Sequence, residues 1–347
     1  MPLDIRNQEM DEIRAFVEGL GEKSFRARQI YEWVWKKNAG SFDQMSNLPL
    51  GLRKSLEKDY VINCLTVNTE QISKDRIRKY GFRTFDDQLV EGVLIPSGKR
   101  ITGCISSQIG CPLNCSFCAT ARLKNRRNLS AGEIFDQVHL LLENATKAYG
   151  AKLSNLVFMG MGEPLLNYEN VLRAISHITS VDGLGISPRR LTLSTVGLKD
   201  GIRRLGDDKF RCLLAISLHS TNDRKRSHIM PINKSNPLPE LAESIKYFFS
   251  QTGTRIIYEY LLMKDFNDST EDARGLAEFC KITPCKVNLI EYNRVEGSPF
   301  ESSTKDRFEA FAGFLESRNM VVNIRRSRGQ DIAAACGQLA GQFLPSI

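Results

Sequence analysis

The sequence has no apolar run long enough to cross a membrane. Its apolar stretches fall well short of the ~20 residues that a membrane helix needs, and the first residues lack the apolar segment of a secretory signal. We therefore expect a soluble, cytoplasmic protein with no membrane partner. Low-complexity linkers are also absent, so we expect the N-terminal part of the chain to pack on the rest.

The chain also lacks the even cysteine count of a disulfide scaffold. Its nine cysteines are an odd number in 347 residues, and thiols inside a cell stay reduced. Three of them, Cys111, Cys115 and Cys118, instead follow the pattern CxxxCxxC, with Phe117 before the last. A structural zinc site would need a fourth ligand, but no Cys or His follows Cys118 within 20 residues.

A 4Fe-4S cluster is the interpretation that these three cysteines favour. Thiolates are the soft ligands that iron–sulfur clusters take. Three thiolates around four irons leave one iron without a protein ligand, and that iron can bind and activate another molecule. The spacing resembles the signature of the radical S-adenosylmethionine superfamily, in which the open iron binds the amino and carboxylate groups of that cofactor.

The net charge of the chain indicates an anionic partner, and its residue pattern indicates three structural parts. With 48 Lys and Arg against 40 Asp and Glu, the formal charge is +8, which favours a polyanion. Residues 1–60 have helical spacing and predict a small helical accessory domain, whose basic side chains could face RNA or solvent. Residues 61–100 predict a β-hairpin extension with a turn at Asp86 and Asp87.

Residues 101–347 alternate between predicted strands and amphipathic helices. Repeated βα units predict a parallel α/β sheet with helices outside, either an open doubly wound sheet or a barrel, and periodicity does not decide between them. The superfamily resemblance implies a partial (βα)6 barrel of TIM-like form. The predicted strands are 101–105, 155–159, 190–195, 213–218, 256–262, 287–291 and 321–325.

Polar residues and glycines follow these strands at their carboxyl ends, where α/β folds place their functional sites. Glycines permit close approach of a ligand, and the polar side chains can bond its ammonium, carboxylate and hydroxyl groups. Any one of them could equally be a strand-end cap. The candidate cofactor-binding residues are Gly162, Glu163, Ser194, Ser217, Leu218, His219 and Asn293.

Longer motifs restrict the resemblance to one group of enzymes within this superfamily. Segments 104–111, 160–166, 193–197, 217–219 and 328–339 are similar to those of the RlmN and Cfr group of ribosomal RNA adenine methyltransferases, over residues 10–342. This resemblance implies methylation of carbon 2 of an adenine in 23S rRNA, at the peptidyl-transferase centre, and of the adenine beside the anticodon in tRNA. Carbon 8, the target of Cfr, remains an alternative.

The resemblance also implies a mechanism with two further cysteines. Carbon 2 of adenine is electron-poor and will not attack an electrophilic methyl group, so a radical route is needed. Cys336 would take a methyl group from one S-adenosylmethionine, and a second molecule, cleaved at the cluster, would supply the radical that removes hydrogen from that methyl group. Cys104 would then close a transient disulfide with Cys336, and Glu91 would accept a proton. An electron donor such as flavodoxin or ferredoxin would be required, and we expect a monomer.

Basic residues near the expected mouth of the site could bind RNA phosphates. They are Lys124, Arg126, Arg127, Arg203, Arg204, Arg224, Lys225, Arg226, Arg325, Arg326 and Arg328. The target base would have to leave its stack to reach a deep site, which favours single-stranded or unfolded RNA. The remaining cysteines match no motif, and we expect them in the core: Cys64, Cys212, Cys280 and Cys285.

Two other classes of function stay open from the residues alone. A radical enzyme that acts on a small molecule or a peptide would share the cluster but would not need Cys336 and Cys104. A non-catalytic RNA-binding protein with a structural metal would need neither the loop at 160–164 nor an open iron.

Overall fold

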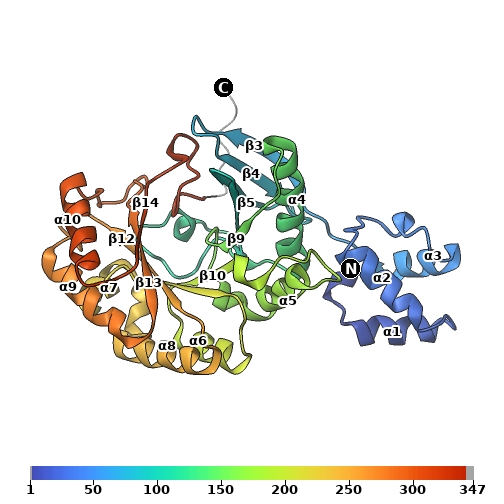
Figure 1. Ribbon diagram of the computed structural model, residues 1–347. Helices are drawn as coiled ribbons and strands as arrows, with labels where there is room; N and C mark the ends of the chain where they lie inside the picture. Colours follow the sequence, from blue (N-terminus) through green and yellow to red (C-terminus); the bar gives the residue numbers. More distant parts are fainter. Residues whose placement is uncertain (1, 341–347) are drawn as a thin grey trace.

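The computed structural model describes residues 2–340, and a sheet of ten strands is its largest element (Figure 1). Pairing is parallel from β6 through β9–β13 to β14 and antiparallel from β3 to β6. In sheet order the strands are β14 (Val322–Arg325), β13 (Cys285–Glu291), β12 (Ile256–Leu262), β11 (Leu213–Ser217), β10 (Leu191–Thr195), β9 (Asn155–Phe158), β6 (Arg100–Ile105), β5 (Leu89–Ser97), β4 (Arg78–Arg83) and β3 (Thr66–Ile72).

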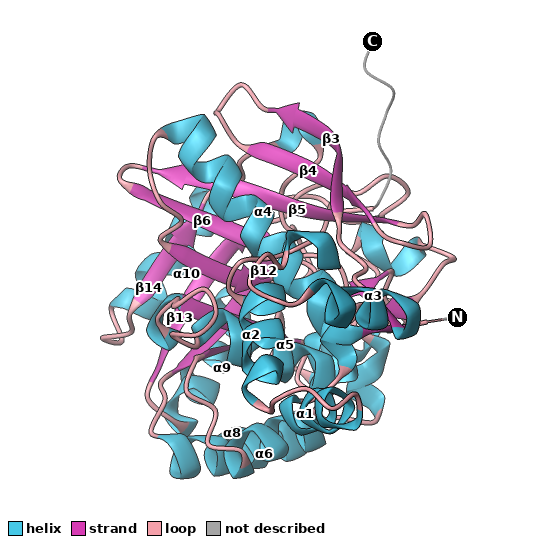
Figure 2. Cartoon of the chain, turned by 90° about the vertical axis from the view of Figure 1, so that its right-hand side faces the viewer, coloured by secondary structure: helices cyan, strands magenta, loops and turns pink. Residues whose placement is uncertain are grey.

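Helices connect successive parallel strands and cover the outside of the curved sheet (Figures 1 and 2). Because β14 and β3 stand at opposite ends of the strand order, the barrel does not close. The α/β partial barrel is confirmed, and each predicted strand lies within two residues of an observed one. The helices are α4 (Ala131–Tyr149), α5 (Tyr168–Thr179), α6 (Lys199–Asp207), α7 (Asp223–Ile229), α8 (Leu238–Thr252), α9 (Thr270–Phe279) and α10 (Lys305–Glu316).

Local sequence explains these elements. All seven residues of β12 are buried, because helices cover one side of a parallel sheet and the barrel interior lies on the other. Helix α4 begins with a capping box, in which Ser130 accepts from the Glu133 N–H and Glu133 reaches back to the Ser130 N–H, and it ends at Gly150, whose φ of 63° suits glycine. Within residues 2–340, no helix combines the length and apolar character that a bilayer crossing requires.

Strands β3, β4 and β5 extend the barrel sheet in antiparallel fashion. β5 pairs directly with β6, with Val93 opposite Cys104. The segment 61–100 therefore extends the barrel sheet beyond β6, the barrel strand that precedes the cysteine motif.

The N-terminal helices form a small lobe at one side of the barrel (Figure 1). They are α1 (Met10–Gly19), α2 (Phe25–Trp35) and α3 (Leu50–Asp59), and their apolar faces are buried against one another. The lobe docks through Trp35, whose ring stacks on His177 at 3.7 Å between centroids. This contact joins α2 to the end of α5.

A buried ion pair also ties the N-terminal lobe to the barrel. Arg6, which is 1% exposed, donates from Nη1 to Asp136 Oδ1 of α4 at 2.7 Å and from Nη2 to the carbonyl of Asn63. The other oxygen of Asp136 accepts from the Leu65 N–H at 2.9 Å. Gly132 leaves room for the arginine, because a Cβ there would lie 2.7 Å from Arg6 Cζ.

We expect Arg6→Met to destabilise the protein strongly. The substitution leaves Asp136 buried without its cation, a change that costs about 3–5 kcal/mol. Urea unfolding measures the loss. Arg14→Met is the matched control, since Arg14 pairs with Asp11 at the exposed surface, where such a pair contributes little. Equal stability of the two variants would contradict this role of Arg6.

Candidate functional site

One cavity lies at the carboxyl ends of the parallel strands, and most of the residues predicted from the sequence line it. Its wall is built from the cysteine motif, the ends of β9 to β13 and the segment 336–339. Of the predicted residues, those in the wall are Cys111, Cys115, Cys118, Gly162, Glu163, Ser194, Ser217, His219, Asn293 and Cys336. Strand ends far apart in the chain thus meet at one place, as the alternation of strands and helices predicts.

The cysteine motif lies in the loop between β6 and α4, and neighbouring segments fix it. The Ser116 N–H donates to the Ile229 carbonyl at the end of α7 (3.0 Å), and the Ala119 N–H donates to the Gly337 carbonyl (2.8 Å). Phe117 packs edge-on against His219, with 4.9 Å between ring centroids. The aromatic residue before Cys118 therefore anchors the loop to the end of β11.

The three thiols of the motif line one cavity. In residues 2–340, no three His, Cys, Asp or Glu side chains stand close enough together to hold one metal ion. The thiols of Cys111, Cys115 and Cys118 nevertheless line the same cavity. A four-iron cluster binds each thiolate to a different iron and so tolerates wider spacing. Burial raises the pKa of Cys111 to about 11 and that of Cys115 well above its usual value.

Glu163 presents a buried carboxylate to this cavity. Its Oε2 accepts from the Val196 N–H (2.9 Å), and its Oε1 accepts from the Leu165 N–H (3.1 Å). Burial raises the pKa of Glu163 to about 7, against the effect of these bonds. The Glu163 side chain is only 2% exposed, and a cationic ligand beside it would stabilise its charged form. Glu163 is therefore suited to bind an ammonium group.

The glycines before Glu163 are required by packing within the protein. A Cβ at Gly160 would lie 2.5 Å from Ser106 Oγ, and one at Gly162 would lie 2.5 Å from Gln108 Cβ. Gly162 also has a φ of 96°, which disfavours a side chain. The loop after β9 therefore packs tightly on the loop after β6, a reason that the sequence did not suggest.

Two residues after β11 differ in their placement. His219 lines the cavity, but its Nδ1 accepts from the Leu261 N–H (3.1 Å), and burial lowers its pKa to about 3, so the ring is neutral. Leu218 is fully buried in the core and does not line this cavity in the described residues. Its carbonyl accepts from Arg226 Nε at 3.1 Å.

The prediction that Arg226 contributes a phosphate-binding charge is wrong. Arg226 is fully buried and bonds to the carbonyls of Leu218, Val196 and Ser217. It therefore ties the ends of β10 and β11 together. The neighbouring Arg224 is exposed, and nothing in the spacing distinguishes the two.

The two outlying cysteines lie near one another as free thiols. Cys104 is buried on β6, and Cys336 is exposed to the cavity on the segment after β14. Burial raises the pKa of Cys104 to about 12, and the proximity of Cys336 adds to this rise. The Cys336 carbonyl accepts from Asn293 Nδ2 at 3.4 Å, which joins the segment to the end of β13.

Glu91 is buried on β5 and is not among the residues that line the cavity in the described chain. Its carboxylate pairs with Lys79 Nζ at 3.3 Å, and its Oε2 accepts from the Ala340 N–H at 2.9 Å. Both carboxylate oxygens of Glu91 therefore have a partner among the described residues.

Of the four cysteines expected in the core, two are buried and two lie at its margin. Cys212 and Cys280 are buried, whereas Cys64 and Cys285 are half-buried. Sequence reasoning missed Glu259, a buried carboxylate that lines the cavity from β12. The sequence does distinguish this residue, because Glu259 is the one charged residue in the apolar run of β12.

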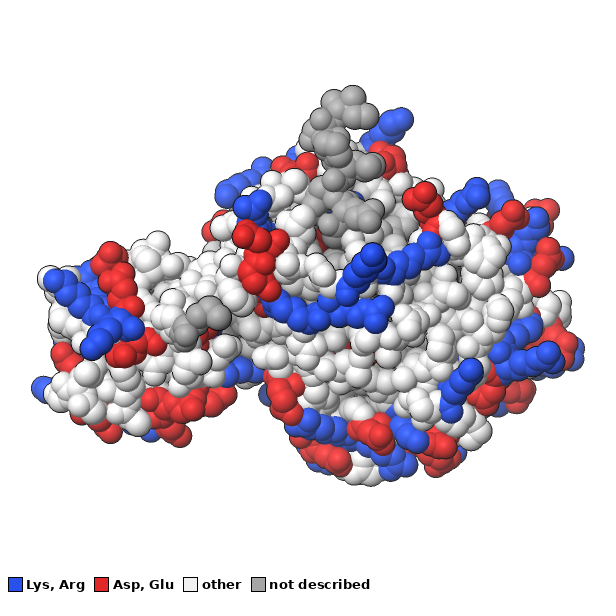
Figure 3. Space-filling view, turned by 180° about the vertical axis from the view of Figure 1, so that it is seen from behind, with Lys and Arg blue, Asp and Glu red and all other residues white. Residues whose placement is uncertain are grey.

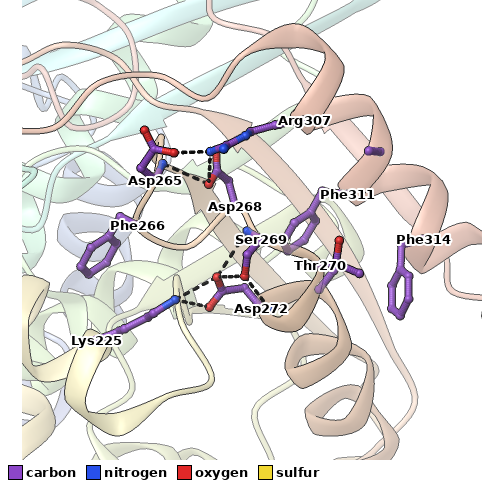
Figure 4. Close-up of a pocket in the computed structure, with 12 residues that line it drawn as sticks. Lys225, Asp265, Phe266, Asp268, Ser269, Thr270, Asp272, Arg307, Phe311 and Phe314 are labelled. Atoms are coloured by element: carbon purple, nitrogen blue, oxygen red, sulfur yellow. Dashed lines mark hydrogen bonds and ion pairs between the residues drawn. The ribbon is translucent and has the colours of Figure 1, made fainter.

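A second cavity lies between α7, the start of α9 and α10 (Figure 4). Its charged side chains are already paired. Lys225 Nζ bonds Asp272 at 2.7 Å, and Arg307 Nη1 lies 3.3 Å from Asp268 (Figure 4). These pairs leave little charge for a ligand, and we assign no function to this cavity.

Comparison with known proteins gives two family matches, one near the N-terminus and one over most of the barrel. Residues 3–62 match the ribosomal RNA large subunit methyltransferase N-terminal domain, and residues 105–277 match the radical SAM superfamily. The chain is 49% identical to the probable dual-specificity RNA methyltransferase RlmN of Cytophaga hutchinsonii, over 97% of this chain and 92% of that protein. It is 42% identical to the dual-specificity RNA methyltransferase RlmN of Anaeromyxobacter dehalogenans, over 99% and 93%.

A solved structure is similar over nearly the whole fold. The radical SAM methyltransferase from Sphaerobacter thermophilus superposes with a TM-score of 0.90 and 38% sequence identity. The match covers 98% of this chain and all of that one. The similarity therefore extends over both the N-terminal lobe and the barrel of this chain.

Proposed function

Because the chain belongs to the RlmN family of radical S-adenosylmethionine methyltransferases and is an enzyme that methylates RNA, we propose that it methylates carbon 2 of adenine. The substrates we propose are 23S rRNA, at the peptidyl-transferase centre, and the adenine beside the anticodon in tRNA. The observation that supports this most is the placement of Cys336 in one cavity with the cysteine motif, with Cys104 close by. A radical enzyme for a small molecule would have no need of that pair.

The family implies a 4Fe-4S cluster and S-adenosylmethionine. Cys111, Cys115 and Cys118 would hold the cluster, which supplies the electron that cleaves the cofactor to a radical. Glu163 would bind the methionyl ammonium group by a charge-assisted hydrogen bond. The other cavity residues would contact the carboxylate, ribose and adenine of the cofactor; they are Gly162, Ser194, Ser217, His219 and Asn293.

Cys336 is the residue that we propose to carry the methyl group. Its thiolate accepts a methyl from one S-adenosylmethionine, and a second molecule is used in the radical step, so two are consumed per methylated base. Cys104 then forms a disulfide with Cys336, which breaks the carbon–sulfur bond and releases the base. Glu91 accepts the proton from carbon 2. An external reductant returns both cysteines to thiols, and flavodoxin or ferredoxin would serve as the electron donor.

The RNA side of the proposal is supported by surface charge. A row of Lys and Arg side chains runs across the middle of the barrel domain on one face (Figure 3). Phosphates bind along such rows, and a base extruded from its stack could then enter the cavity. We propose that residues 1–60 form an accessory RNA-binding domain, that 61–100 extend the sheet beside the site, and that the enzyme acts as a cytoplasmic monomer.

Mass mapping of the modified base tests the proposal. The reconstituted holoenzyme is incubated with S-adenosylmethionine, reductant and unmodified 23S rRNA or tRNA, and the nucleosides are compared with authentic 2-methyladenosine and 8-methyladenosine. We expect 2-methyladenosine in both RNAs. Formation of 8-methyladenosine would place the enzyme with Cfr, and unmethylated RNA beside a modified peptide or metabolite would refute the proposal.

Glu163→Ala should weaken cofactor binding and leave the cluster in place. A lost charge-assisted hydrogen bond is worth ~1.5–3 kcal/mol, which corresponds to a roughly ten- to hundredfold rise in Kd. Isothermal titration of S-adenosylmethionine against the holoenzyme measures the change. Glu169→Ala is the matched control, because Glu169 is exposed and pairs with Arg204 on the surface.

The same contact predicts a pH dependence. The pKa of Glu163 is raised to about 7 by burial, and only the charged form above that pH attracts an ammonium group. Affinity for S-adenosylmethionine should therefore rise as the pH increases through neutrality, and Glu163→Ala should flatten the profile. An equally steep profile in the variant would assign Glu163 a structural role.

A further inference from the structure

The turn between β4 and β5 carries an exposed aromatic ring, that of Phe85, which is 60% exposed. β5 runs antiparallel to β6, with Val93 opposite Cys104. The start of β5 and the end of β6 therefore lie at the same edge of the sheet, and the cysteine motif follows β6 at that edge. Phe85 thus stands at the cavity end of the barrel, although it is not among the described residues that line the cavity.

Arg127 fixes this turn in place. Its Nε and Nη2 donate to the two carboxylate oxygens of Asp86 at 2.8 and 2.6 Å. Its Nη1 and Nη2 donate to the two oxygens of Glu133 at 2.8 Å, and Nη1 also donates to the Asn128 carbonyl at 3.1 Å. Its guanidinium carbon lies 5.3 Å from the centroid of the Phe85 ring. All five N–H groups of Arg127 are used within the protein, so this cation orients the turn and the ring and is not free to bind a phosphate.

The residue that holds the turn is itself joined to the cofactor cavity. Arg127 belongs to β8 (Arg127–Asn128), which pairs with β7 (Gln108–Ile109) on the other side of the cysteine motif. The side chain of Gln108 donates to Asn128 Oδ1 at 2.7 Å and accepts from the Glu163 N–H at 2.8 Å. A continuous set of hydrogen bonds therefore runs from the cavity wall to the turn that carries Phe85.

Uncompensated positive charge lies beside this ring in the chain. Lys124 and Arg126, just before Arg127, are exposed. The three oxygens that accept from Arg126 are uncharged, and they include the carbonyls of Leu123 and Ala121. A rigid aromatic ring next to exposed cations is the arrangement that binds single-stranded nucleic acid, because bases stack on the ring while phosphates pair with the cations.

We propose that Phe85, held by Arg127, is a stacking platform for a base that flanks the target adenine of the RNA substrate, and that Lys124 and Arg126 bind the adjacent phosphates. The inference rests on the proposed function and adds a substrate contact outside the cavity. A target base that leaves its stack exposes the face of its neighbour, and Phe85 covers that face. Every base has such a face, so the contact orients the strand without reading its sequence. Because Arg127 already fixes the ring, little order is lost on binding.

RNA binding by the holoenzyme tests the proposal. The probe is an unmodified, fluorescently labelled RNA oligonucleotide that carries the target adenine of 23S rRNA and its flanking sequence, and anisotropy gives its Kd. Phe85→Ala should raise the Kd roughly five- to hundredfold. Phe85→Trp should retain affinity, whereas Phe85→Leu, which is apolar but has no aromatic face, should bind as weakly as Phe85→Ala. Val181→Ala is the control and should bind normally, because Val181 is exposed in the loop before β10, at the opposite end of the barrel.

Removal of single bases from the probe identifies the partner of the ring. Abasic nucleotides are placed one at a time on either side of the target adenine. At one position the unaltered enzyme should lose affinity while Phe85→Ala loses almost none, since the two changes remove the same contact. Affinity for S-adenosylmethionine should be the same in all variants.

An unchanged Kd in Phe85→Ala would overturn the proposal. Full affinity in Phe85→Leu would also overturn it, because the contact would then be apolar and not a stack. Equal losses in both enzymes at every abasic position, or weakened cofactor binding in Phe85→Ala, would assign Phe85 a structural role instead. If the unaltered enzyme methylates the RNA while Phe85→Ala binds it normally, only this inference fails. Absence of methylation by the unaltered enzyme would refute the proposed function and this inference with it.

Discussion

An enzyme in which Cys115 is replaced by alanine should bind little iron and should methylate no RNA. Three thiolates are the whole protein ligand set for the cluster that the family implies, so loss of one leaves it under-ligated. Cys115 is 8% exposed, and the apolar residues around it offer no replacement ligand. They include Ile229, Met230 and Leu261. Cluster loss should therefore be nearly complete, and activity should fall to background.

Iron and sulfide analysis of anaerobically reconstituted protein checks this expectation. We expect about four irons per chain before substitution and well under half of that in Cys115→Ala. Cys212→Ala is the control, because Cys212 is a buried cysteine outside the motif, and it should keep its iron. Full iron content together with cofactor cleavage in Cys115→Ala would refute the cluster assignment.

Replacement of the two outlying cysteines should have opposite chemical consequences. Cys336→Ala should form no S-methylcysteine and no methylated RNA, because it lacks the sulfur that carries the methyl group. Cys104→Ala should still methylate Cys336 and join it to the base, but it cannot resolve the bond. RNA should therefore remain covalently attached to the protein.

Denaturing gels detect this adduct directly. In Cys104→Ala it should survive reductant, since a carbon–sulfur bond holds it, and it should be missing from the variant that lacks both cysteines. Normal turnover by Cys104→Ala would contradict the two-cysteine mechanism. An adduct that forms equally without Cys336 would do the same.

The barrel could be predicted because its signals are local. An apolar run such as β12 marks a buried strand, and the cysteine motif carries its spacing within eight residues. Residues after successive strands meet at one edge by topology alone, so Glu163, Ser194 and Asn293 could be assigned to one site. These features need no knowledge of which strand pairs with which.

The remaining features depend on strand order and on burial. The contact of Glu259 with Arg325 requires β12, β13 and β14 to be neighbours in a fixed register. Arg226 reads like Arg224 in the sequence, yet it is buried among strand-end carbonyls. Glu91 likewise accepts a hydrogen bond from Ala340, which follows it by 249 positions. Such contacts come from tertiary packing, which periodicity does not record.

The measurement that tests the account most directly follows the methyl group itself. The holoenzyme is supplied with S-adenosylmethionine that carries a fully deuterated methyl group, and the methylated adenosine of 23S rRNA is isolated and weighed by mass spectrometry. If Cys336 carries the methyl and a radical removes hydrogen from it, 2-methyladenosine should have lost one deuterium and gained one hydrogen. A fully deuterated methyl group on the base would show direct transfer and would contradict the central role of Cys336.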